Sequence, residues 1–416
     1  MRRNSHLSQL WIAVLVCMVA GCGGSNSNST TQTAPLSGLS RRVLVSNSFS
    51  ATINFVDAQK DLLNAKTLGG NDVTKMITAG GTTIALDGAG SEIPIIDNAT
   101  EAVTFNAAIG DQPFDIALSP DGLTAWAAMR NFGFVQSVNT TTGIANSVIR
   151  LANARRIVMS PNGTKLLIFL DPQANISPKN TFVVLDIASN TLRSITDVAH
   201  LDQPFTAVFG SSDTQAFILN CGAECAGTAA SVVSVDFSGA VPVFAPSAAP
   251  IAVAGATVGT LNGTTLYVAG SPTTPVAGCP LSRCGVLSVI DTNALTVSAS
   301  VPITDGLHEN IALTSTGRVY VGSGGCSVQA DAPSNTTRGC LAIFNTTSST
   351  TTFPVQSSFR QNFNVTGLQP ITKRNVIYVT QGGALDIFDT NTDALETGIT
   401  QIDIVGSAKA VVLLDP

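Results

Sequence analysis

The chain has 416 residues, of which 44% are hydrophobic and only 12% are charged. Thr, Ser, Asn and Gly are abundant, whereas the Lys and Glu runs that favour helices are few. This composition is typical of an all-β protein from outside the cytoplasm, with a surface that is polar rather than charged. Acidic residues (27) outnumber Lys and Arg (21). This balance argues against nucleic acid as a partner, since phosphate binding needs clustered Lys and Arg.

Residues 1–21 have the pattern of an export signal. Arg2 and Arg3 precede an apolar run that is too short to span a bilayer as a stable anchor. The segment ends in Val-Ala-Gly before Cys22, which resembles the lipobox of bacterial lipoproteins. The resemblance implies cleavage before Cys22 and lipid attachment to its thiol, and the glycine that follows favours the outer membrane. The alternative is a plain secretory signal in which Cys22 is incidental.

Residues 22–40 are rich in Gly, Ser, Asn and Thr and contain little that a core could bury. We expect a flexible tether with a reach of roughly 20–25 Å. No later apolar run approaches the ~20 residues of a transmembrane helix, so the lipid would be the only attachment to the membrane. Residues 41–416 then form a single folded domain.

The clearest unit of this domain is residues 111–151. It contains four short runs rich in β-branched and aromatic residues, separated by Pro-Asp-Gly and Thr-Gly turns, which predict four antiparallel strands. We call these strands a, b, c and d. Such a sheet leaves apolar surface on both faces and therefore needs neighbours of its own kind.

The b–c pair recurs eight times, at intervals that grow from about 40 to nearly 60 residues, and a four-stranded unit of this period predicts a β-propeller. The b strands are predicted at Val43–Asn47, Thr83–Asp87, Ala125–Met129, Leu166–Leu170, Ala216–Asn220, Leu266–Gly270, Val319–Ser323 and Val376–Thr380. The c strands end at Asp57, Asp97, Asn139, Asp186, Asp236, Asp291, Asn345 and Asp389.

Several a strands end in turns such as Leu118-Ser-Pro-Asp-Gly122 and Met159-Ser-Pro-Asn-Gly163. Together with c strands of the Val-Ile-Asp type, these turns resemble the YVTN family of propeller repeats. The resemblance covers essentially all of residues 41–416. It implies radially arranged blades and identifies no particular activity.

Residues 408–415 have the pattern of an a strand with no b strand after it, whereas the first repeat begins at strand b. We predict that the C-terminal strand completes the first blade and closes the ring, which removes the free sheet edges. This gives eight blades. Seven, the usual number for the family, is the alternative if the second repeat, which lacks the Pro-Asp-Gly turn, is a distorted copy.

The order of the strands places the b–c and d–a connections on one face, which we call the loop face. Long loops on a rigid scaffold often carry binding sites, although neutral drift also lengthens loops. The tether enters at a b strand on the opposite face, so the loop face would point away from the membrane. The b–c loops lengthen in the later repeats, at residues 171–180, 221–230, 271–285 and 324–339.

Three of these long loops each contain one pair of cysteines. An exported chain with an even number of locally paired cysteines predicts disulfides. The rival is zinc, but no histidine lies at ligand spacing and no Cys-x-x-Cys pair is present. The predicted bonds are Cys221–Cys225, Cys279–Cys284 and Cys326–Cys340.

The mature chain has two histidines, His200 and His308, which we expect in d–a loops near the mouth of the central funnel. They lie beside Asp202 and beside Asp305 and Glu309, so they could act as bases or bind a metal. A solvated loop histidine is the commoner outcome. The motifs of serine hydrolases, zinc proteases, phosphate-binding loops and haem attachment are absent from the sequence.

We therefore predict a binding or scaffolding module of the cell envelope, without cofactor or metal, that acts through its loop face. Its partner would be an envelope protein, a peptide or a polysaccharide. The alternative is a hydrolase resembling the propeller lactonases. That activity requires its acids and histidines to converge on one cavity, and the candidates are His200, Asp202, Asp305, His308 and Glu309.

Overall fold

The computed structural model covers the chain, and residues from Leu36 onward form one compact unit. The predicted signal segment, Cys22, most of the tether and Asp111 lie outside the described residues. The structure describes residues 35–88, 90–110, 112–129, 131, 133–171, 179–239, 241–244, 249–281, 283–327, 329–331, 336–355 and 363–415.

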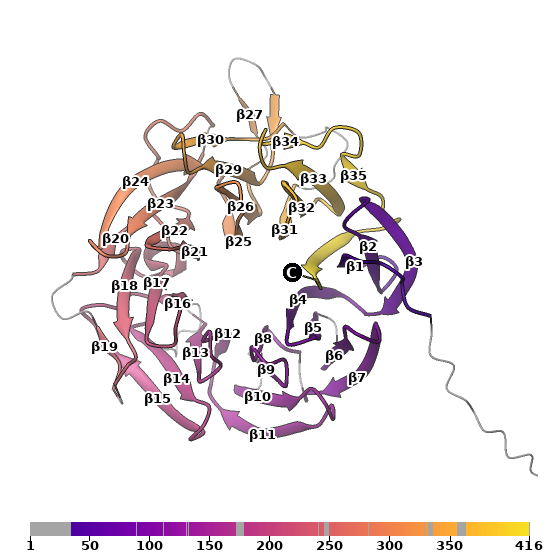
Figure 1. Ribbon diagram of the computed structural model, residues 1–416. Helices are drawn as coiled ribbons and strands as arrows, with labels where there is room; N and C mark the ends of the chain where they lie inside the picture. The colour runs from indigo at the N-terminus through magenta and orange to yellow at the C-terminus, as the bar shows by residue number, and fades with distance from the viewer. Residues whose placement is uncertain are drawn as a thin grey trace, which may run out of the picture. The chain divides into compact units, whose positions relative to one another are not determined.

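Eight antiparallel sheets stand in a ring around a central axis, so the predicted eight-bladed propeller is confirmed (Figure 1). The a strands line the axis and are β4 (Val73–Ala79), β8 (Asp115–Leu118), β12 (Ala154–Met159), β16 (Pro204–Phe209), β21 (Val258–Asn262), β25 (Leu307–Leu313), β31 (Val365–Ile371) and β36 (Ala408–Leu413). The b strands follow, as β1 (Arg42–Asn47), β5 (Thr82–Asp87), β9 (Thr124–Met129), β13 (Lys165–Leu170), β17 (Gln215–Asn220), β22 (Thr265–Gly270), β26 (Arg318–Gly324) and β32 (Val376–Gln381). All eight lie within one residue of their predicted bounds.

The c and d strands form the outer half of each blade. The c strands are β2 (Thr52–Asp57), β6 (Glu92–Asp97), β10 (Phe134–Asn139), β14 (Thr181–Asp186), β18 (Ser231–Asp236), β23 (Gly285–Asp291), β29 (Leu341–Asn345) and β33 (Ala384–Asp389). The unbroken d strands are β3 (Leu62–Gly69), β7 (Ala102–Ala108), β11 (Ala145–Arg150), β15 (Thr191–Thr196), β24 (Thr296–Ile303) and β30 (Thr350–Thr352).

Blades 5 and 8 depart from this pattern, because their d strands are split into two short pieces. These pieces are β19 (Val243–Phe244) and β20 (Ile251–Ala252) in blade 5, and β34 (Ala394–Leu395) and β35 (Gln401–Ile402) in blade 8. Among the described residues, two b–c loops carry extra elements, namely the 3-10 helix η1 (Gly222–Cys225) and a hairpin of β27 (Gln329–Asp331) and β28 (Thr336–Arg338). In the described part of the chain, no helix is long and apolar enough to cross a membrane.

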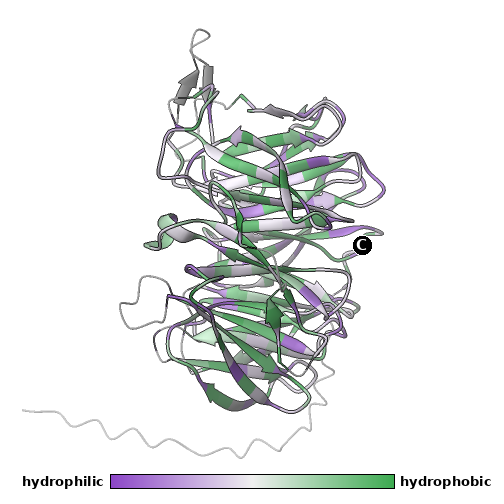
Figure 2. Cartoon of the chain, turned by 90° about the vertical axis from the view of Figure 1, so that its left-hand side faces the viewer, coloured by the Kyte–Doolittle hydropathy of each residue, from purple (hydrophilic) through white to green (hydrophobic). Residues whose placement is uncertain are grey.

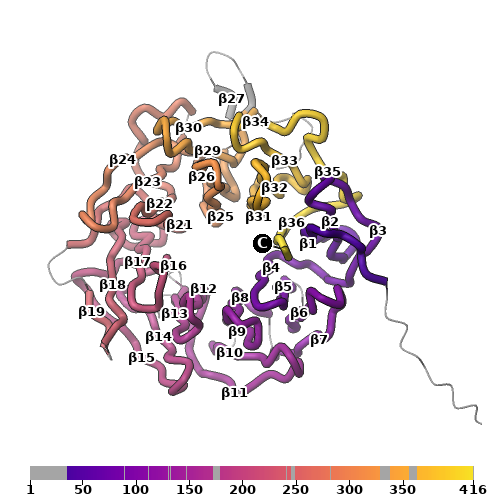
Figure 3. Tube along the Cα trace, in the orientation of Figure 1, coloured from indigo at the N-terminus to yellow at the C-terminus, as the bar shows by residue number. Residues whose placement is uncertain are grey.

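The first blade contains both ends of the domain, as predicted. Strand β36 pairs antiparallel with β1, with Val43 opposite Leu413 and Val45 opposite Val411. Two further contacts hold the junction: the backbone N–H of Arg42 donates to Asp415 at 2.8 Å, and the Arg42 guanidinium lies 2.6 Å from the same carboxylate. Figure 3 shows the trace of β36 beside that of β1.

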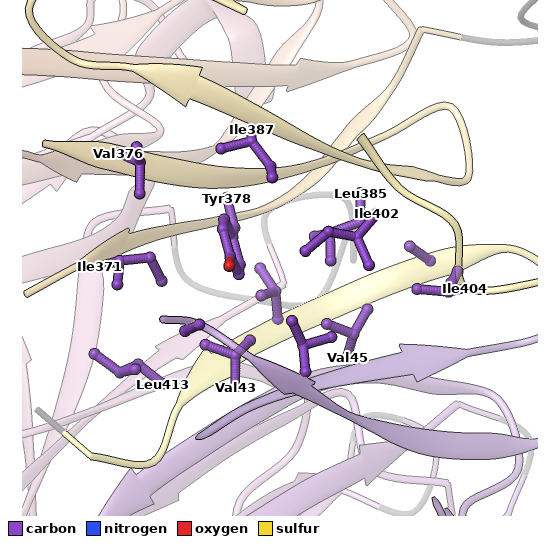
Figure 4. Close-up of a cluster of buried hydrophobic side chains, with 14 residues drawn as sticks. Val43, Val45, Ile371, Val376, Tyr378, Leu385, Ile387, Ile402, Ile404 and Leu413 are labelled. Atoms are coloured by element: carbon purple, nitrogen blue, oxygen red, sulfur yellow. The ribbon is translucent and has the colours of Figure 1, made fainter. Parts of the chain in front are cut away.

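The core is divided among the interfaces between blades. Because side chains alternate along a strand, Val43 and Val45 face blade 8 (Figure 4), whereas Leu44 faces blade 2. Among the described residues, one cluster of buried hydrophobic side chains lies between each pair of neighbouring blades, eight in all. Figure 2 shows hydrophobic residues along the strands of the body.

Six a strands share a β-bulge near the mouth of the central channel. A bulge inserts one extra residue, bends the strand and re-aims the side chains beside it, so these a strands can turn polar side chains into the channel. In five of these strands the register shifts between Val73 and Lys75, between Ala154 and Arg156, between Pro204 and Thr206, between His308 and Asn310, and between Val365 and Gly367. In β36 the shift lies between Ala408 and Val411, which pair with Asn47 and Val45 of β1.

The propeller body begins a few residues before the predicted boundary at residue 41. The side chain of Ser37 donates a hydrogen bond to the buried carboxylate of Glu101 at 2.6 Å. Leu39 packs against the cluster between blades 1 and 2. These contacts attach the end of the predicted tether to the body, because an apolar side chain and a buried acceptor were both available there.

Closure by β36 predicts a large cost for shortening Leu413, which is 4% exposed between blades 1 and 8. We expect Leu413→Ala to lower the free energy of unfolding by about 2–5 kcal/mol, because it leaves a cavity at the junction. Leu62 lies in the same blade but is 53% exposed, so Leu62→Ala should change stability by no more than about 0.5 kcal/mol. Denaturant titration of both variants measures the difference. Equal midpoints would show that β36 is only loosely attached.

Candidate functional site

A cavity of about 810 Å³ opens on the loop face where blades 5, 6 and 7 meet. We call it the rim pocket. Its size is within the range of small-ligand sites, about 300–1,000 Å³. It is lined by Glu224 of the blade 5 loop, by much of the blade 6 loop from Ser271 to Cys284, by Asp305 and Gly306 of the β24–β25 connection, and by Gly325 and Ser327 of the blade 7 loop.

All three predicted disulfides are present, one in each of the loops that form the rim pocket. They join cysteines that lie 4, 5 and 14 positions apart in the chain, so each loop is closed on itself. The blade 5 bond is also part of the core, since Cys221 and Cys225 are buried against Phe205. The bonds are Cys221–Cys225, Cys279–Cys284 and Cys326–Cys340.

The blade 5 loop presents Glu224 from η1. Gly222 has a φ of +55°, and a Cβ there would lie 2.2 Å from the backbone of Ala229. Only glycine therefore fits at this position, where the two ends of the loop approach each other closely. The Glu224 carboxylate accepts a hydrogen bond from the backbone N–H of Ser271 at 2.9 Å. The Ser271 hydroxyl then donates to the carbonyl of Gly306 at 2.7 Å. Hydrogen bonds thus join the blade 5 loop, the blade 6 loop and the β24–β25 connection.

Burial raises the pKa of Glu224 to about 7, and the hydrogen bond from Ser271 opposes this shift only in part. Removing a carboxylate from water disfavours its charged form. The group therefore exists in both protonation states near neutral pH, so it can accept hydrogen bonds or donate one. A strongly shifted acid in a cavity is a candidate functional group.

Asp202 and Asp305, two of the acids expected at the funnel mouth, fasten loops. The Asp305 carboxylate accepts hydrogen bonds from the backbone N–H and the hydroxyl of Ser327, at 2.9 and 2.7 Å. Asp202 accepts from the backbone N–H groups of Thr228 and Ala229 in the same way. Burial opposes ionisation of Asp202, but these hydrogen bonds outweigh it and hold its pKa below the usual value. Each aspartate thus holds the b–c loop of the blade that follows it.

The prediction of a solvated loop position was wrong for His308. This residue lies within β25 and is completely buried. Its Nε2 donates to the carbonyl of Thr304 at 2.8 Å, and a Cβ on Gly285 would lie 2.5 Å from its ring. Burial lowers the pKa of His308 to about 4, so the side chain is neutral at physiological pH. It is a packing residue that solvent does not reach.

His200 lies in the β15–β16 connection, which is a d–a loop as predicted. Its Nδ1 is 2.8 Å from the carboxylate of Asp197, and its ring stacks on Phe244 with centroids 4.9 Å apart. Phe244 belongs to the outer strand β19, so the imidazole faces the outer part of blade 5 and not the channel. This position separates it from the other expected site residues.

Glu309 lies in the central channel, where it meets Arg156 of β12 at 2.7 Å. The channel cavity measures about 370 Å³, and its mouth is crossed by this ion pair between blades 4 and 7. The Arg156 guanidinium also lies over the ring of Phe205, 4.2 Å from its centroid. The five residues of the predicted hydrolase site are therefore dispersed. His200 faces the outer part of blade 5, Asp202 holds the blade 5 loop, and Asp305 lines the rim pocket. His308 lies in the core, and Glu309 lies in the channel.

Nothing in the described part of the chain groups three His, Cys, Asp or Glu side chains so that they could hold a metal ion. The rim pocket itself contains two carboxylates, those of Glu224 and Asp305, and one guanidinium, that of Arg283. The other described lining residues supply hydroxyl groups, the Cys279–Cys284 disulfide, glycine backbone, and proline, valine and leucine side chains. This arrangement suits recognition of a ligand that is partly polar and partly apolar.

Sequence reasoning missed Glu224. The one available signal was its position between Cys221 and Cys225, inside a predicted disulfide loop. Nothing in the sequence shows that residues 271 and 306 come to lie beside it. The cavity depends on three loops that are about 50 residues apart.

No protein-family model matches the sequence, and no curated protein matches it either. The structure is similar to that of the dihydro-heme d1 dehydrogenase NirN in complex with DHE, with a TM-score of 0.61, 11% identity, and coverage of 90% of this chain and 75% of that chain. It is also similar to a protein of unknown function from Desulfotomaculum acetoxidans (TM-score 0.53, 14% identity, 91% and 100% coverage). Apo AztD from Citrobacter koseri is a third similar structure (0.51, 12%, 90% and 98%). At these identities the likeness establishes the β-propeller fold alone.

The shifted pKa of Glu224 predicts a specific pH dependence of stability. The folded protein retains this proton up to about pH 7, whereas the unfolded chain releases it near pH 4.5, so the group lowers stability as the pH rises between these values. We expect Glu224→Gln, which cannot ionise, to be more stable than the wild type by roughly 3 kcal/mol at pH 8 and by little at pH 4.5. Denaturant titrations at both pH values measure the difference.

The control is Glu92→Gln, which removes an exposed carboxylate at the start of β6 in blade 2. Its effect on stability should be the same at pH 4.5 and pH 8. A Glu224→Gln effect that is equally independent of pH would contradict the assignment of a partly buried Glu224 with a raised pKa.

Proposed function

We propose that this protein is an exported binding module that holds a peptide segment of another envelope protein in the rim pocket. The observation that carries the proposal is the convergence of three consecutive b–c loops, each closed by its own disulfide, on one cavity. A rigid ring with shaped loops on one face is a common arrangement for binding sites.

The disulfides support a binding role better than a purely stabilising one. The covalent loops are short, so each bond restricts the unfolded chain by at most about 3 kcal/mol. Their larger effect is to fix the conformation of loops on the surface. A loop that is already ordered loses less conformational entropy when a ligand binds, and this increases affinity.

The wall of the rim pocket favours a peptide over a polysaccharide. Pro272, Pro275, Val276 and Leu281 supply aliphatic surface, and Ser271 and Glu224 supply polar groups. Saccharide rings usually stack on aromatic side chains, and the described lining of the pocket contains none. A peptide needs the combination that is present, with aliphatic patches for side chains and hydrogen-bonding groups for polar atoms.

The location of the protein is part of the proposal. We take the repeats to be of the YVTN type and the chain to be anchored in the outer membrane by a lipid on Cys22. Strand β1 begins at Arg42 on the face opposite the rim pocket, since a b strand runs toward the loop face. A tether that enters there leaves the rim pocket accessible to partners in the surrounding compartment.

A hydrolase remains without support from the geometry. The five side chains considered for it do not share a cavity, and the most buried of them, His308, has no access to solvent. We therefore assign no catalytic role to these residues.

The binding proposal predicts that a photo-reactive amino acid at Thr274, an exposed position of the rim pocket, captures a partner in intact cells. The same amino acid at Ser211, an exposed position in the β16–β17 turn on the opposite face, should capture none. Mass spectrometry identifies the captured protein. Equal capture at both positions, or at neither, would contradict binding through the loop face.

The anchoring proposal predicts that Cys22→Ser abolishes metabolic labelling with a fatty-acid analogue. We expect the variant to move from the membrane fraction to the soluble fraction, because the lipid would be its only attachment. Unchanged labelling and fractionation would show that Cys22 is incidental and that the segment is a plain secretory signal.

A further inference from the structure

The Glu224 carboxylate has unused capacity to accept hydrogen bonds within the rim pocket. In the described part of the chain its one hydrogen bond comes from the backbone N–H of Ser271, at 2.9 Å from Oε2. An ionised carboxylate has about four acceptor sites on its two oxygens. Oε1 therefore has no hydrogen-bond donor from the described protein, although the side chain lines a cavity of about 810 Å³.

Two other buried acids of this propeller are matched with cations. Glu101 lies 3.2 Å from both Arg42 and Lys66, and Asp61 lies 2.6 Å from Arg374. Glu224 differs, because burial is the main influence on its ionisation and no neighbouring cation contributes. A carboxylate that is partly withdrawn from water without a counter-charge is stabilised by a positive charge that reaches it.

The structure points to the class of group that would supply this charge. Resting on the peptide-binding function proposed above, we propose that the rim pocket recognises a cationic side chain of the bound peptide, a lysine ammonium or an arginine guanidinium, which forms an ion pair with Glu224. The aliphatic stem of such a side chain packs on apolar surface while its head meets the carboxylate. Pro272, Val276 and Leu281 supply that surface in the same cavity.

Two other ligands fit less well. A metal ion needs several converging ligands, and the described residues contain no group of three His, Cys, Asp or Glu side chains. A neutral hydroxyl group would donate a hydrogen bond to Glu224 but would leave its negative charge uncompensated in the pocket. Arg283 is the one cation among the described lining residues, and it is exposed.

An ion pair with Glu224 makes binding dependent on pH. With a pKa of about 7, the carboxylate is ionised in roughly one-tenth of molecules at pH 6 and in roughly nine-tenths at pH 8. The apparent affinity for a cationic peptide scales with the ionised fraction, so it should rise about tenfold between these pH values. Ligand ammonium and guanidinium groups stay charged throughout this range.

The test uses an array of hexapeptides that contain lysine or arginine, each beside a neutral counterpart with acetyl-lysine or citrulline. The array is probed with the purified full-length chain as wild type, as Glu224→Gln and as Glu92→Gln, the exposed control in blade 2. We expect the wild type and Glu92→Gln to retain cationic peptides and to bind the neutral counterparts at least tenfold more weakly. Glu224→Gln should bind the cationic peptides at least tenfold more weakly than the wild type does. Calorimetry of one retained peptide at pH 6 and pH 8 then measures the rise in affinity.

Glu224→Gln keeps a carbonyl oxygen that can accept the Ser271 N–H, so it should fold, and a thermal melt verifies this. Binding that is equal for charged and neutral peptides, or for the wild type and Glu224→Gln, overturns the cation assignment and leaves the proposed function intact. The same conclusion follows if no cationic peptide is retained while Thr274 still captures a partner in cells. If the array and the capture at Thr274 both fail, the inference and the proposed function are both wrong.

Discussion

The structure depends on the fact that both faces of every blade are apolar. In β1, Val43 and Val45 point toward blade 8 while Leu44 points toward blade 2, and the other blades repeat this alternation. A four-stranded sheet with two apolar faces is stable only between two neighbours, so any open arc of blades would leave two such faces in water. Pairing of β36 with β1 is therefore the step on which the other blades rely, because it joins the last interface to the first.

A closed ring of this kind separates stability from function. The strands must keep their alternation, but the connections on the loop face can vary without disturbing it. Blade 8 joins β32 to β33 through Gly382 and Gly383 alone, whereas blade 6 uses residues 271–284 for the same connection. The elaborated loops belong to consecutive blades, so they meet, and the aspartates of the preceding connections fasten two of them. The rim pocket forms because the long b–c loops belong to neighbouring blades and not to blades scattered around the ring.

The parts of this structure that the sequence predicts are those determined locally. Strand alternation, the Asp or Asn at the end of each c strand and the spacing of the cysteines located the blades and the three disulfides. Closure joins distant segments, but it followed from the a strand at residues 408–415 that has no b strand after it. The doubtful second repeat is a full blade because Gly80 and Gly81, with φ values of +54° and +83°, form a two-residue hairpin in place of the Pro-Asp-Gly turn.

What sequence reasoning missed depends on distant segments. The Arg156–Glu309 pair joins residues 153 positions apart, His308 is buried by Gly285 and Thr304, and Glu224 acquires its surroundings from two later connections.

The contrast between the channel and the rim pocket indicates where a ligand is accommodated. Side chains turned inward near the a-strand bulges make the channel mouth the obvious place for a site, yet those side chains satisfy one another: Arg156 with Glu309, and Lys75 with Asp115 at 2.6 Å. A ligand that binds there would first have to separate charges that are already matched. The rim pocket has the opposite character. The loop that presents Glu224 is closed by the Cys221–Cys225 bond, which packs against Phe205. The cavity is larger, and Glu224 retains an acceptor that the described protein does not fill. Binding there adds an interaction without first breaking one.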